Sequence, residues 1–200
     1  MSACSKNDKP APAITDSFTD SFERDELGSD YYATSNDAYS LSNGSLRAMG
    51  GYNRPLWLRR RLPDAATIEV DAWSQSPAGD IKVEIYGDGK SYDPDKGAYM
   101  STGYVLVMGG WNNSKSLIAR LDEHGKDVAT RTSPKVEIGR RYHWKIQRNG
   151  GRIDWYVDDM TVPFLTLEDP TPLTGDGHGY FSFNNWESDV GFDNLVIRKN

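Results

Sequence analysis

Apolar and polar positions alternate with a period of two along most of this chain. Near the end, Phe181 and Phe183 alternate with more polar residues, and a second run follows over residues 190–197 after a short polar loop. Successive side chains of a β-strand point to opposite faces, so this period predicts strands. The last run is apolar on both faces, and we therefore expect it to lie well inside a sheet.

Further strands are predicted wherever the alternation recurs between turn-forming residues. They cover residues 39–42, 45–49, 56–62, 67–74, 80–86, 104–108, 117–121, 142–148 and 153–157. Asn43-Gly44 supplies the positive φ angles that a type I′ hairpin turn needs between the first two of them. No stretch has a convincing helical period, so the predicted fold class is all-β, a sandwich with at most one short helix.

Three motifs resemble a known family. Asn184-Asn185-Trp186 stands before Val190-Gly191-Phe192-Asp193-Asn194-Leu195, an Ile-x-Trp-x-Val-Asp-Asp hairpin occupies residues 153–159, and Asp-x-Phe occurs at 16–18 and 20–22. Together they resemble concanavalin A-like (laminin G, laminarinase-like) jelly-roll domains, among them bacterial domains labelled 3-keto-disaccharide hydrolase. The resemblance covers residues 16–200 and implies a jelly-roll sandwich of two antiparallel sheets, with the Asp-x-Phe segment beside the last strand. It says little about function, because this fold carries lectins, hydrolases, lyases and adhesion modules.

The beginning of the chain differs in composition from the rest. Residues 1–15 are rich in Pro and charge, so we predict a disordered tether there and a single β-sandwich domain over residues 16–200. Ser2-Ala3-Cys4-Ser5 resembles the end of a bacterial lipobox, although Met1 stands where a Leu is usual. The resemblance implies lipidation at Cys4 and a lipid-anchored protein of the bacterial periplasm or cell surface. The alternative is an incidental thiol.

Charge and hydropathy argue against nucleic-acid binding and against a membrane-spanning segment. The net charge is −6 and Arg59-Arg60-Arg61 is the one basic run, so we expect no nucleic-acid partner. No apolar stretch approaches the roughly 20 residues that span a bilayer. Nothing in the pattern indicates an oligomeric state.

The segment Glu69-Val70-Asp71-Ala72-Trp73 is the candidate for glycoside hydrolysis. A retaining glycosidase needs two carboxyl groups about 5 Å apart, and laminarinase-type enzymes of the resembled fold carry Glu-x-Asp-x-Glu on one strand. Here Trp73 takes the place of the second Glu. We expect Glu84, on the next strand, to face the same side, which makes Glu69, Asp71 and Glu84 catalytic candidates. The alternative is that these carboxylates pair with Lys82 or with arginines on a solvated sheet.

Sugar binding is the second candidate chemistry. Aromatic rings stack on the C–H faces of sugars, while polar side chains bond the hydroxyl groups. We expect a concave sheet face to hold a carbohydrate through Trp57, Arg59, Trp73, Tyr86, Trp111 and Asn112. Trp144, Trp155 and Phe183 are expected in the core instead.

Histidines and metals complete the list of candidates. His124 and His178 lie beside carboxylates in glycine-flanked turns; two such residues do not predict a transition-metal site, but His124 is a fourth catalytic candidate. Resemblance to concanavalin A-like domains further implies a structural Ca²⁺ held by Asp193 and Asp20. The alternative is that Asp193 bonds neighbouring backbone. No other cofactor is expected.

The leading hypothesis is a glycan-binding module of a bacterial envelope lipoprotein, with the sugar held on the concave sheet face. The first alternative is a glycoside hydrolase or polysaccharide lyase, including one for 3-keto-sugars, acting on the same face. The second alternative is a protein-interaction or scaffold module.

Overall fold

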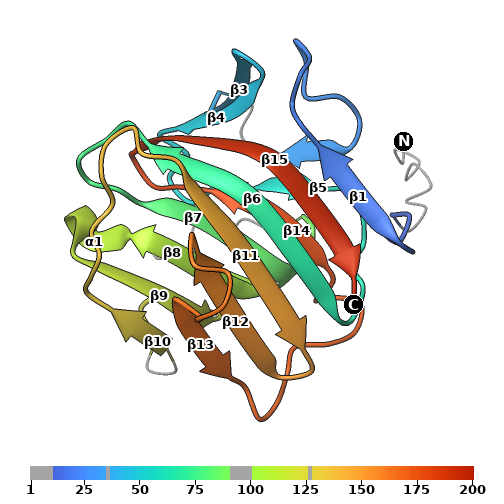
Figure 1. Cartoon of the computed structure of the whole chain (residues 1–200). Coiled ribbons are helices and arrows are strands. Elements are labelled where there is room, and N and C mark those ends of the chain that lie inside the picture. The colour runs from blue at the N-terminus through green and yellow to red at the C-terminus, as the bar shows by residue number, and fades with distance from the viewer. Residues whose placement is uncertain (1–10, 35–36, 91–100, 126–127) are drawn as a thin grey trace, which may run out of the picture.

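The computed structural model describes residues 11–34, 37–90, 101–125 and 128–200 of the chain. Strands dominate it, with one short helix (Figure 1). The elements are β1 (Ser17–Asp20), β2 (Tyr31–Ala33), β3 (Tyr39–Ser42), β4 (Ser45–Met49), β5 (Leu56–Leu58), β6 (Ala66–Ser74), β7 (Ile81–Gly87), β8 (Tyr104–Gly109), α1 (Gly110–Asn113), β9 (Lys115–Arg120), β10 (Val128–Arg131), β11 (Tyr142–Asn149), β12 (Arg152–Val157), β13 (Leu165–Glu168), β14 (Tyr180–Asn184) and β15 (Asp189–Lys199).

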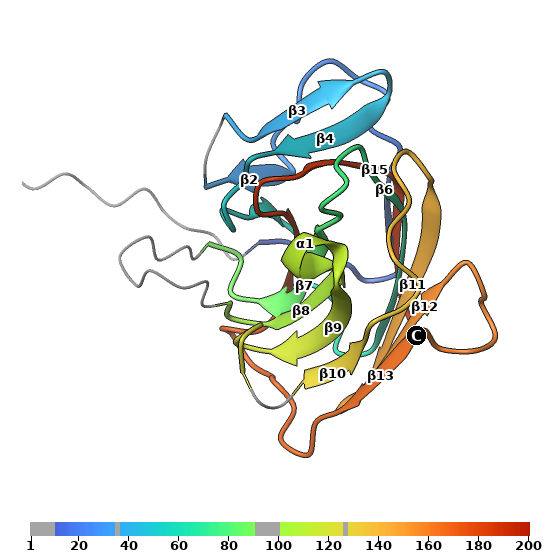
Figure 2. The same cartoon turned by 90° about the vertical axis from the view of Figure 1, so that its left-hand side faces the viewer.

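The strands form two antiparallel sheets that pack face to face (Figure 2). The eight-stranded sheet has the order β13-β12-β11-β6-β15-β4-β3, with β1 paired to β15 beside this path. The seven-stranded sheet has the order β10-β9-β8-β7-β14-β5-β2. The predicted all-β sandwich with one short helix is confirmed. β15 lies between β6 and β4, and β1 pairs with it from Ser17↔Arg198 to Asp20↔Leu195, as expected.

The core lies between the sheets and is built by alternate residues of each strand. The buried positions include Ile68, Val70 and Ala72 of β6 and Ile81, Val83 and Ile85 of β7. Trp144, Trp155 and Phe183 are fully buried, which confirms their predicted core role. Burying an apolar side chain of Val, Leu or Phe size stabilises the fold by about 1.5–3 kcal/mol, so this layer holds the two sheets together.

Neighbouring strands in the sequence often lie in opposite sheets. β6 belongs to the eight-stranded sheet and β7 to the seven-stranded one, and β14 and β15 are divided in the same way. The expectation that residues 67–74 and 80–86 share one polar face is therefore wrong, because the segment between them crosses from one sheet to the other. The predicted β3–β4 hairpin is confirmed, with positive φ angles of 52° at Asn43 and 69° at Gly44.

The segment just before the predicted domain boundary at residue 16 already contacts the sandwich. The Arg61 N–H donates to the Pro12 carbonyl, the Ile14 N–H donates to the Arg61 carbonyl, and Ile14 is buried in the core. Cys4 and the rest of residues 1–10 lie outside the described residues. In the part of the chain that the structure describes, no helix is long and apolar enough to cross a membrane.

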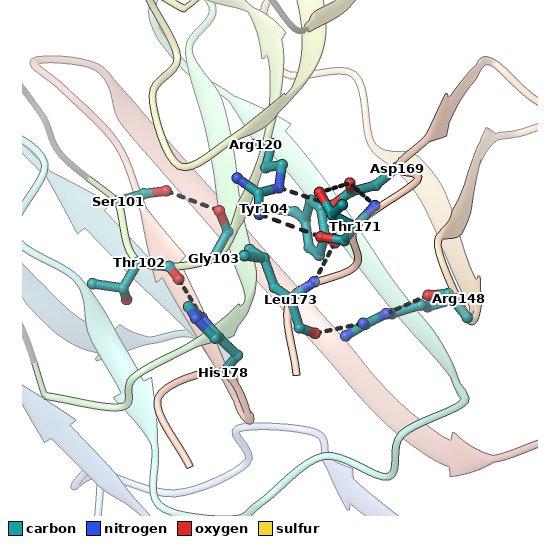
Figure 3. A network of polar contacts seen from close by, with 11 residues as sticks. Ser101, Thr102, Gly103, Tyr104, Arg120, Arg148, Asp169, Thr171, Leu173 and His178 are labelled. Carbon is teal, nitrogen blue, oxygen red and sulfur yellow. Dashed lines mark hydrogen bonds and ion pairs between the residues drawn. The ribbon is translucent and has the colours of Figure 1, made fainter. Parts of the chain in front are cut away.

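A polar network closes the end of the sandwich where β8 begins (Figure 3). The Tyr104 hydroxyl donates to Asp169 Oδ2 over 2.6 Å and accepts the Leu173 N–H over 2.9 Å. Arg120 Nε donates to the same carboxylate, and Arg148 Nη2 donates to the Leu173 carbonyl. Burial raises the pKa of Asp169, but the bonds from Tyr104, the Thr171 N–H and Arg120 outweigh it and hold that pKa below its usual value.

Candidate functional site

The four catalytic candidates do not converge. Glu69 and Asp71 project from the outer side of β6, in the eight-stranded sheet, whereas Glu84 projects from β7 in the other sheet. Glu84 Oε1 accepts the N–H groups of Thr102 and Gly103 at 2.9 and 2.7 Å. The prediction that Glu84 joins Glu69 and Asp71 on one face is wrong, because consecutive strands diverge into opposite sheets.

Glu69 and Asp71 instead flank a histidine that the sequence analysis did not single out. His143, on neighbouring β11, has Nδ1 2.7 Å from Asp71 Oδ1 and Nε2 3.3 Å from Glu69 Oε2. Arg198 pairs with Glu69, and the Asn194 amide donates to Asp71 Oδ2 over 2.9 Å. The carboxylates are thus bound by side chains of their own sheet, as expected if they do not act as catalysts. An arginine is among the partners, and Lys82 is not. The polar alternation of 142–148 puts His143 on that outer face, but the β6–β11 pairing is visible only in three dimensions.

Of the predicted aromatic platforms, Trp57 and Tyr86 are buried, and Trp73 lies against other groups of its own sheet. Trp57 is 1% exposed and Tyr86 is 2% exposed, so both are wrong as open platforms. Tyr86 lies in the core because a register shift opposite β14 turns it inward, with its hydroxyl donating to the Pro63 carbonyl. Trp73 packs against the Gly191 backbone, where a Cβ atom would come within 2.1 Å of the indole, and Arg141 covers the ring at 4.0 Å from its centroid.

Arg59 is also separated from the other candidates. It lies just beyond β5 at the edge of the seven-stranded sheet, with its guanidinium 5.4 Å from the ring centroid of Tyr32. Trp111, Asn112 and His124 remain, and these three lie together at the end of the sheet where β8 stops.

Lys82 is the centre of that region. Its side chain is 2% exposed, and Nζ donates to Asn53 Oδ1 over 2.7 Å. The ammonium lies 2.9 Å from Glu123 Oε2 and 3.8 Å from Asp80 Oδ1. A buried ammonium is stable only with such partners, because desolvating an unpaired charge costs several kcal/mol.

Contacts extend from this lysine to aromatic residues on two sides, and we call the whole group the Lys82 ring. Asp80 Oδ2 accepts the Trp186 N–H over 2.5 Å, and the Trp186 and Tyr52 rings meet edge-on at 5.1 Å. On the other side Trp111 meets His124 edge-on at 5.4 Å. The ring consists of Tyr52, Asn53, Asp80, Lys82, Trp111, Glu123, His124 and Trp186.

The aromatic members of the Lys82 ring face solvent. Trp186 is 46% exposed, Tyr52 43% and Trp111 36%. Asn112, next to Trp111, is exposed as well. The site therefore combines open aromatic surface with buried charge.

Backbone strain is concentrated in the same place. The described residues contain twelve non-glycine residues with positive φ, and six of them are Tyr52, Asn53, Asp80, Trp111, Asn112 and Asn113. A left-handed conformation costs an L-residue about 1–2 kcal/mol, and such strain gathers at functional sites. The rest of the fold stabilises these turns.

Asn113 holds the Trp111 turn in position. Its side-chain amide donates to the Val136 carbonyl over 2.7 Å and accepts the Val136 N–H over 2.8 Å. The turn follows Gly109, whose φ of 69° and tight packing against Val136 exclude a side chain. These contacts leave Trp111 and Asn112 projecting outward.

The charges of the ring are unequally compensated. Burial raises the pKa of Asp80, while Lys82 and the Trp186 N–H oppose that effect only in part. Deeper on the same outer face, Trp57 Nε1 and Ser182 Oγ are buried and have no hydrogen-bond partner among the described residues, and their strands pair at these positions. The 8-stranded sheet has the opposite character, since its outward carboxylates Glu69, Asp71 and Asp193 are each bound by a cation or an amide.

The residues expected to hold Ca²⁺ do not fit it. Both oxygens of Asp20 accept hydrogen bonds from Arg24, and Oδ2 also accepts the Tyr31 hydroxyl. Asp193 pairs with Arg141 at 3.0 Å. Within the described residues, no group of three or more His, Cys, Asp or Glu side chains is arranged to hold a metal ion. His178 bonds the Thr102 carbonyl through Nδ1 over 2.8 Å, the role expected of a turn histidine.

Sequence comparison gives the family of the chain. The family model described as "Farnesoic acid 0-methyl transferase" matches residues 92–195. The chain belongs to this family. Membership does not by itself assign the reaction named in that description to this chain. No sequence among the curated proteins matches it.

Solved structures share the fold of this family member. The carbohydrate-binding module CBM66 from Bacillus subtilis has a TM-score of 0.64 at 14% identity, covering 85% of this chain and 96% of that one. The VIP36 exoplasmic/lumenal domain in its Ca²⁺/Man3GlcNAc-bound form has a TM-score of 0.61 at 10% identity, with 86% and 83% covered. The β-glucanase of Bacillus licheniformis reaches 0.59 at 12% identity, with 92% and 98% covered. The expected concanavalin A-like jelly roll is confirmed, and identities this low show the fold alone.

Proposed function

We propose that this protein is a glycan-binding module and that the Lys82 ring is its binding site. The carrying observation is the ring itself, in which three exposed aromatic side chains surround a buried lysine on strained backbone. Trp186 and Tyr52 offer apolar ring surface for the C–H face of a sugar, and Asp80 and Asn112 offer polar groups for its hydroxyls. The carbohydrate-binding module and the oligosaccharide-bound lectin domain among the structural neighbours support the same class of ligand.

The test is a glycan array probed with the purified chain and two matched variants. Trp186→Ala removes a platform of the ring, and we expect it to weaken binding by roughly 30-fold, the effect of losing a contact worth about 2 kcal/mol. Trp73→Ala removes a tryptophan of the opposite sheet and is expected to leave binding unchanged. Binding that survives Trp186→Ala but not Trp73→Ala would falsify this location of the site. No binding to any glycan would leave the scaffold alternative.

Hydrolysis at the same ring is the second candidate. Asp80 and Glu123 are two carboxylates that approach one lysine, and burial raises the pKa of Asp80, as a general acid requires. If the chain is a glycoside hydrolase, the wild type would release reducing sugars. This release would be lost in both Asp80→Asn and Glu123→Gln. A lyase would instead release unsaturated products, seen by their ultraviolet absorbance.

We further propose that the module is anchored to a bacterial envelope through a lipid on Cys4. Support comes from the lipobox-like Ser2-Ala3-Cys4-Ser5 and the polar, Pro-containing segment behind it. Mass spectrometry of the chain expressed behind a lipoprotein signal peptide tests this, with Cys4→Ser as the control. An unmodified Cys4 would overturn the anchoring proposal and leave glycan binding untouched. A structural Ca²⁺ is not part of the proposal, because arginines already neutralise Asp20 and Asp193.

A further inference from the structure

An ammonium group of the protein lies on an aromatic platform of the site. Lys115 Nζ is 3.7 Å from the ring centroid of Trp111, a short cation–π contact. Lys115 is joined to the Trp111 turn through its pairing with Gly110. Among the described residues, Lys115 makes no ion pair with a carboxylate. The platform is thus suited to a cation, and the side chain that now covers it is a flexible one.

One exposed carboxylate and two largely buried ones lie near this platform. Asp122 is 42% exposed and lies 3.6 Å from the ring of His124, which itself contacts Trp111. Asp80 and Glu123 complete a group of three carboxylates, with 14% and 7% of their side chains exposed, and both face the single buried cation Lys82. The whole chain carries a net charge of −6. An incoming positive charge is therefore attracted both at long range and at the site.

A ligand ammonium near Asp80 would favour the charged form of this carboxylate. Its pKa is raised chiefly by burial, which means that Lys82 and the Trp186 N–H leave its negative charge under-compensated. A ligand ammonium close to the carboxylate favours the ionised form, and by linkage ionised Asp80 favours the ligand. An acidic sugar would meet the opposite situation, since its carboxylate would approach three others.

We propose that the Lys82 ring selects glycans that carry free ammonium groups, the amino sugars. The ligand ammonium replaces that of Lys115 on Trp111, with the neighbouring carboxylates as its counter-charges. Lys115 is then a specificity-determining residue, because its ammonium competes with the ligand for the Trp111 ring. Only a ligand that binds the ring more favourably than Lys115 does can displace this side chain. This inference rests on the proposed glycan-binding function.

The test compares two ligands that differ only in acetylation. Glucosamine oligomers and N-acetylglucosamine oligomers of equal length are titrated calorimetrically into the full chain in mildly acidic buffer. We expect the free amine form to bind at least about tenfold more tightly, and the preference to shrink as salt is added, because salt screens exposed charges. Equal affinity for the two oligomers, or binding of neutral glycans alone, overturns the inference while the glycan-binding function stands. No binding to any glycan overturns both.

A lysine variant separates competition from ligand contact. Lys115→Met keeps an unbranched side chain of similar length and removes the charge, and we expect it to strengthen glucosamine-oligomer binding about two- to fivefold, the equivalent of one exposed cation–π contact. Lys145→Met is the matched control, because Lys145 Nζ also lies over a ring, that of Tyr156 at 4.0 Å, but on the opposite sheet. The control is expected to bind like wild type. Weaker binding by Lys115→Met would mean that Lys115 contacts the ligand, which contradicts its role as a competitor.

Discussion

β8 connects two polar networks of opposite character. At its first residue, Tyr104, a carboxylate, two arginines and backbone groups are bonded to one another at the end of the sandwich (Figure 3). At its last residue, Gly109, the chain turns into three consecutive left-handed residues and presents Trp111 to solvent. The first network lowers the pKa of its carboxylate Asp169, whereas the second leaves that of Asp80 raised.

The difference separates a structural network from the proposed binding site. Groups that complete one another's hydrogen bonds and charges have little left to offer a ligand. Strained backbone, exposed aromatic rings and an under-compensated carboxylate persist in a folded protein when another selective advantage maintains them. Three substitutions sharpen this contrast, and they are taken in order of decreasing expected effect.

Lys82→Met should have the largest effect on stability. It removes the cation between Asp80 and Glu123 and leaves two buried carboxylates facing each other, so we expect a loss of about 3–5 kcal/mol in the free energy of unfolding. Arg198→Met, which breaks the Glu69 pair on the exposed face of the other sheet, is the matched control and should cost at most about 1 kcal/mol. Urea unfolding of the three proteins checks both values. Similar losses in the two variants would remove the distinction between the buried and the exposed pair.

Asp169→Asn should have the next largest effect, and one that depends on pH. Near neutral pH we expect a loss of about 1–3 kcal/mol, because the amide cannot accept all the bonds now made by Tyr104, Arg120 and the Thr171 N–H. The folded-state pKa of Asp169 lies below the ordinary 3.8, so its stabilisation is present above that value and disappears as pH falls through the folded pKa.

Wild type and Asp169→Asn should therefore become more alike in stability below about pH 4. Urea unfolding at neutral pH and at two acidic pH values measures the convergence. Asp20, whose pKa is lowered as well, stays in both proteins and sets a common acid sensitivity. A stability difference that remains constant with pH would show that the Asp169 carboxylate does not stabilise the fold through its charge.

Asn113→Ala should have the smallest effect on stability and a clear one on binding. It removes the paired bonds to Val136, and we expect a loss of about 1 kcal/mol in the free energy of unfolding. Because Trp111 then loses its fixed position, glycan affinity should fall by more than that energy explains. Ser40→Ala, on an exposed position of edge strand β3, provides a control that alters neither quantity. An unchanged glycan affinity would mean that the strained turn does not serve the ligand.

The strand pattern made the fold predictable. Alternation fixes which residues of one strand share a face, and β6, β11 and β15 occur where it places them. Alternation does not fix the sheet to which a strand belongs. Glu84 was therefore grouped with Asp71, although the crossing between β6 and β7 puts them on opposite sides of the molecule.

The site was predictable only in part for a similar reason. Trp111, Asn112 and His124 were identified because they follow glycines or lie in polar turns. Tyr52 and Trp186 were not, since nothing in their local sequence distinguishes an exposed aromatic residue from a buried one. The turn that carries Trp111 is bonded through Asn113 to Val136, more than twenty residues away in the sequence, and no local pattern reveals this contact.

The crossing of consecutive strands between sheets has a mechanical consequence. Tyr52 lies between β4 and β5, Asp80 between β6 and β7, and Trp186 between β14 and β15, and each of these connections leaves one sheet and enters the other. A ligand that contacts all three connections would link the two sheets of the sandwich. A bound ligand would therefore oppose sliding of one sheet over the other. It would also reduce the motion of strands that it does not contact.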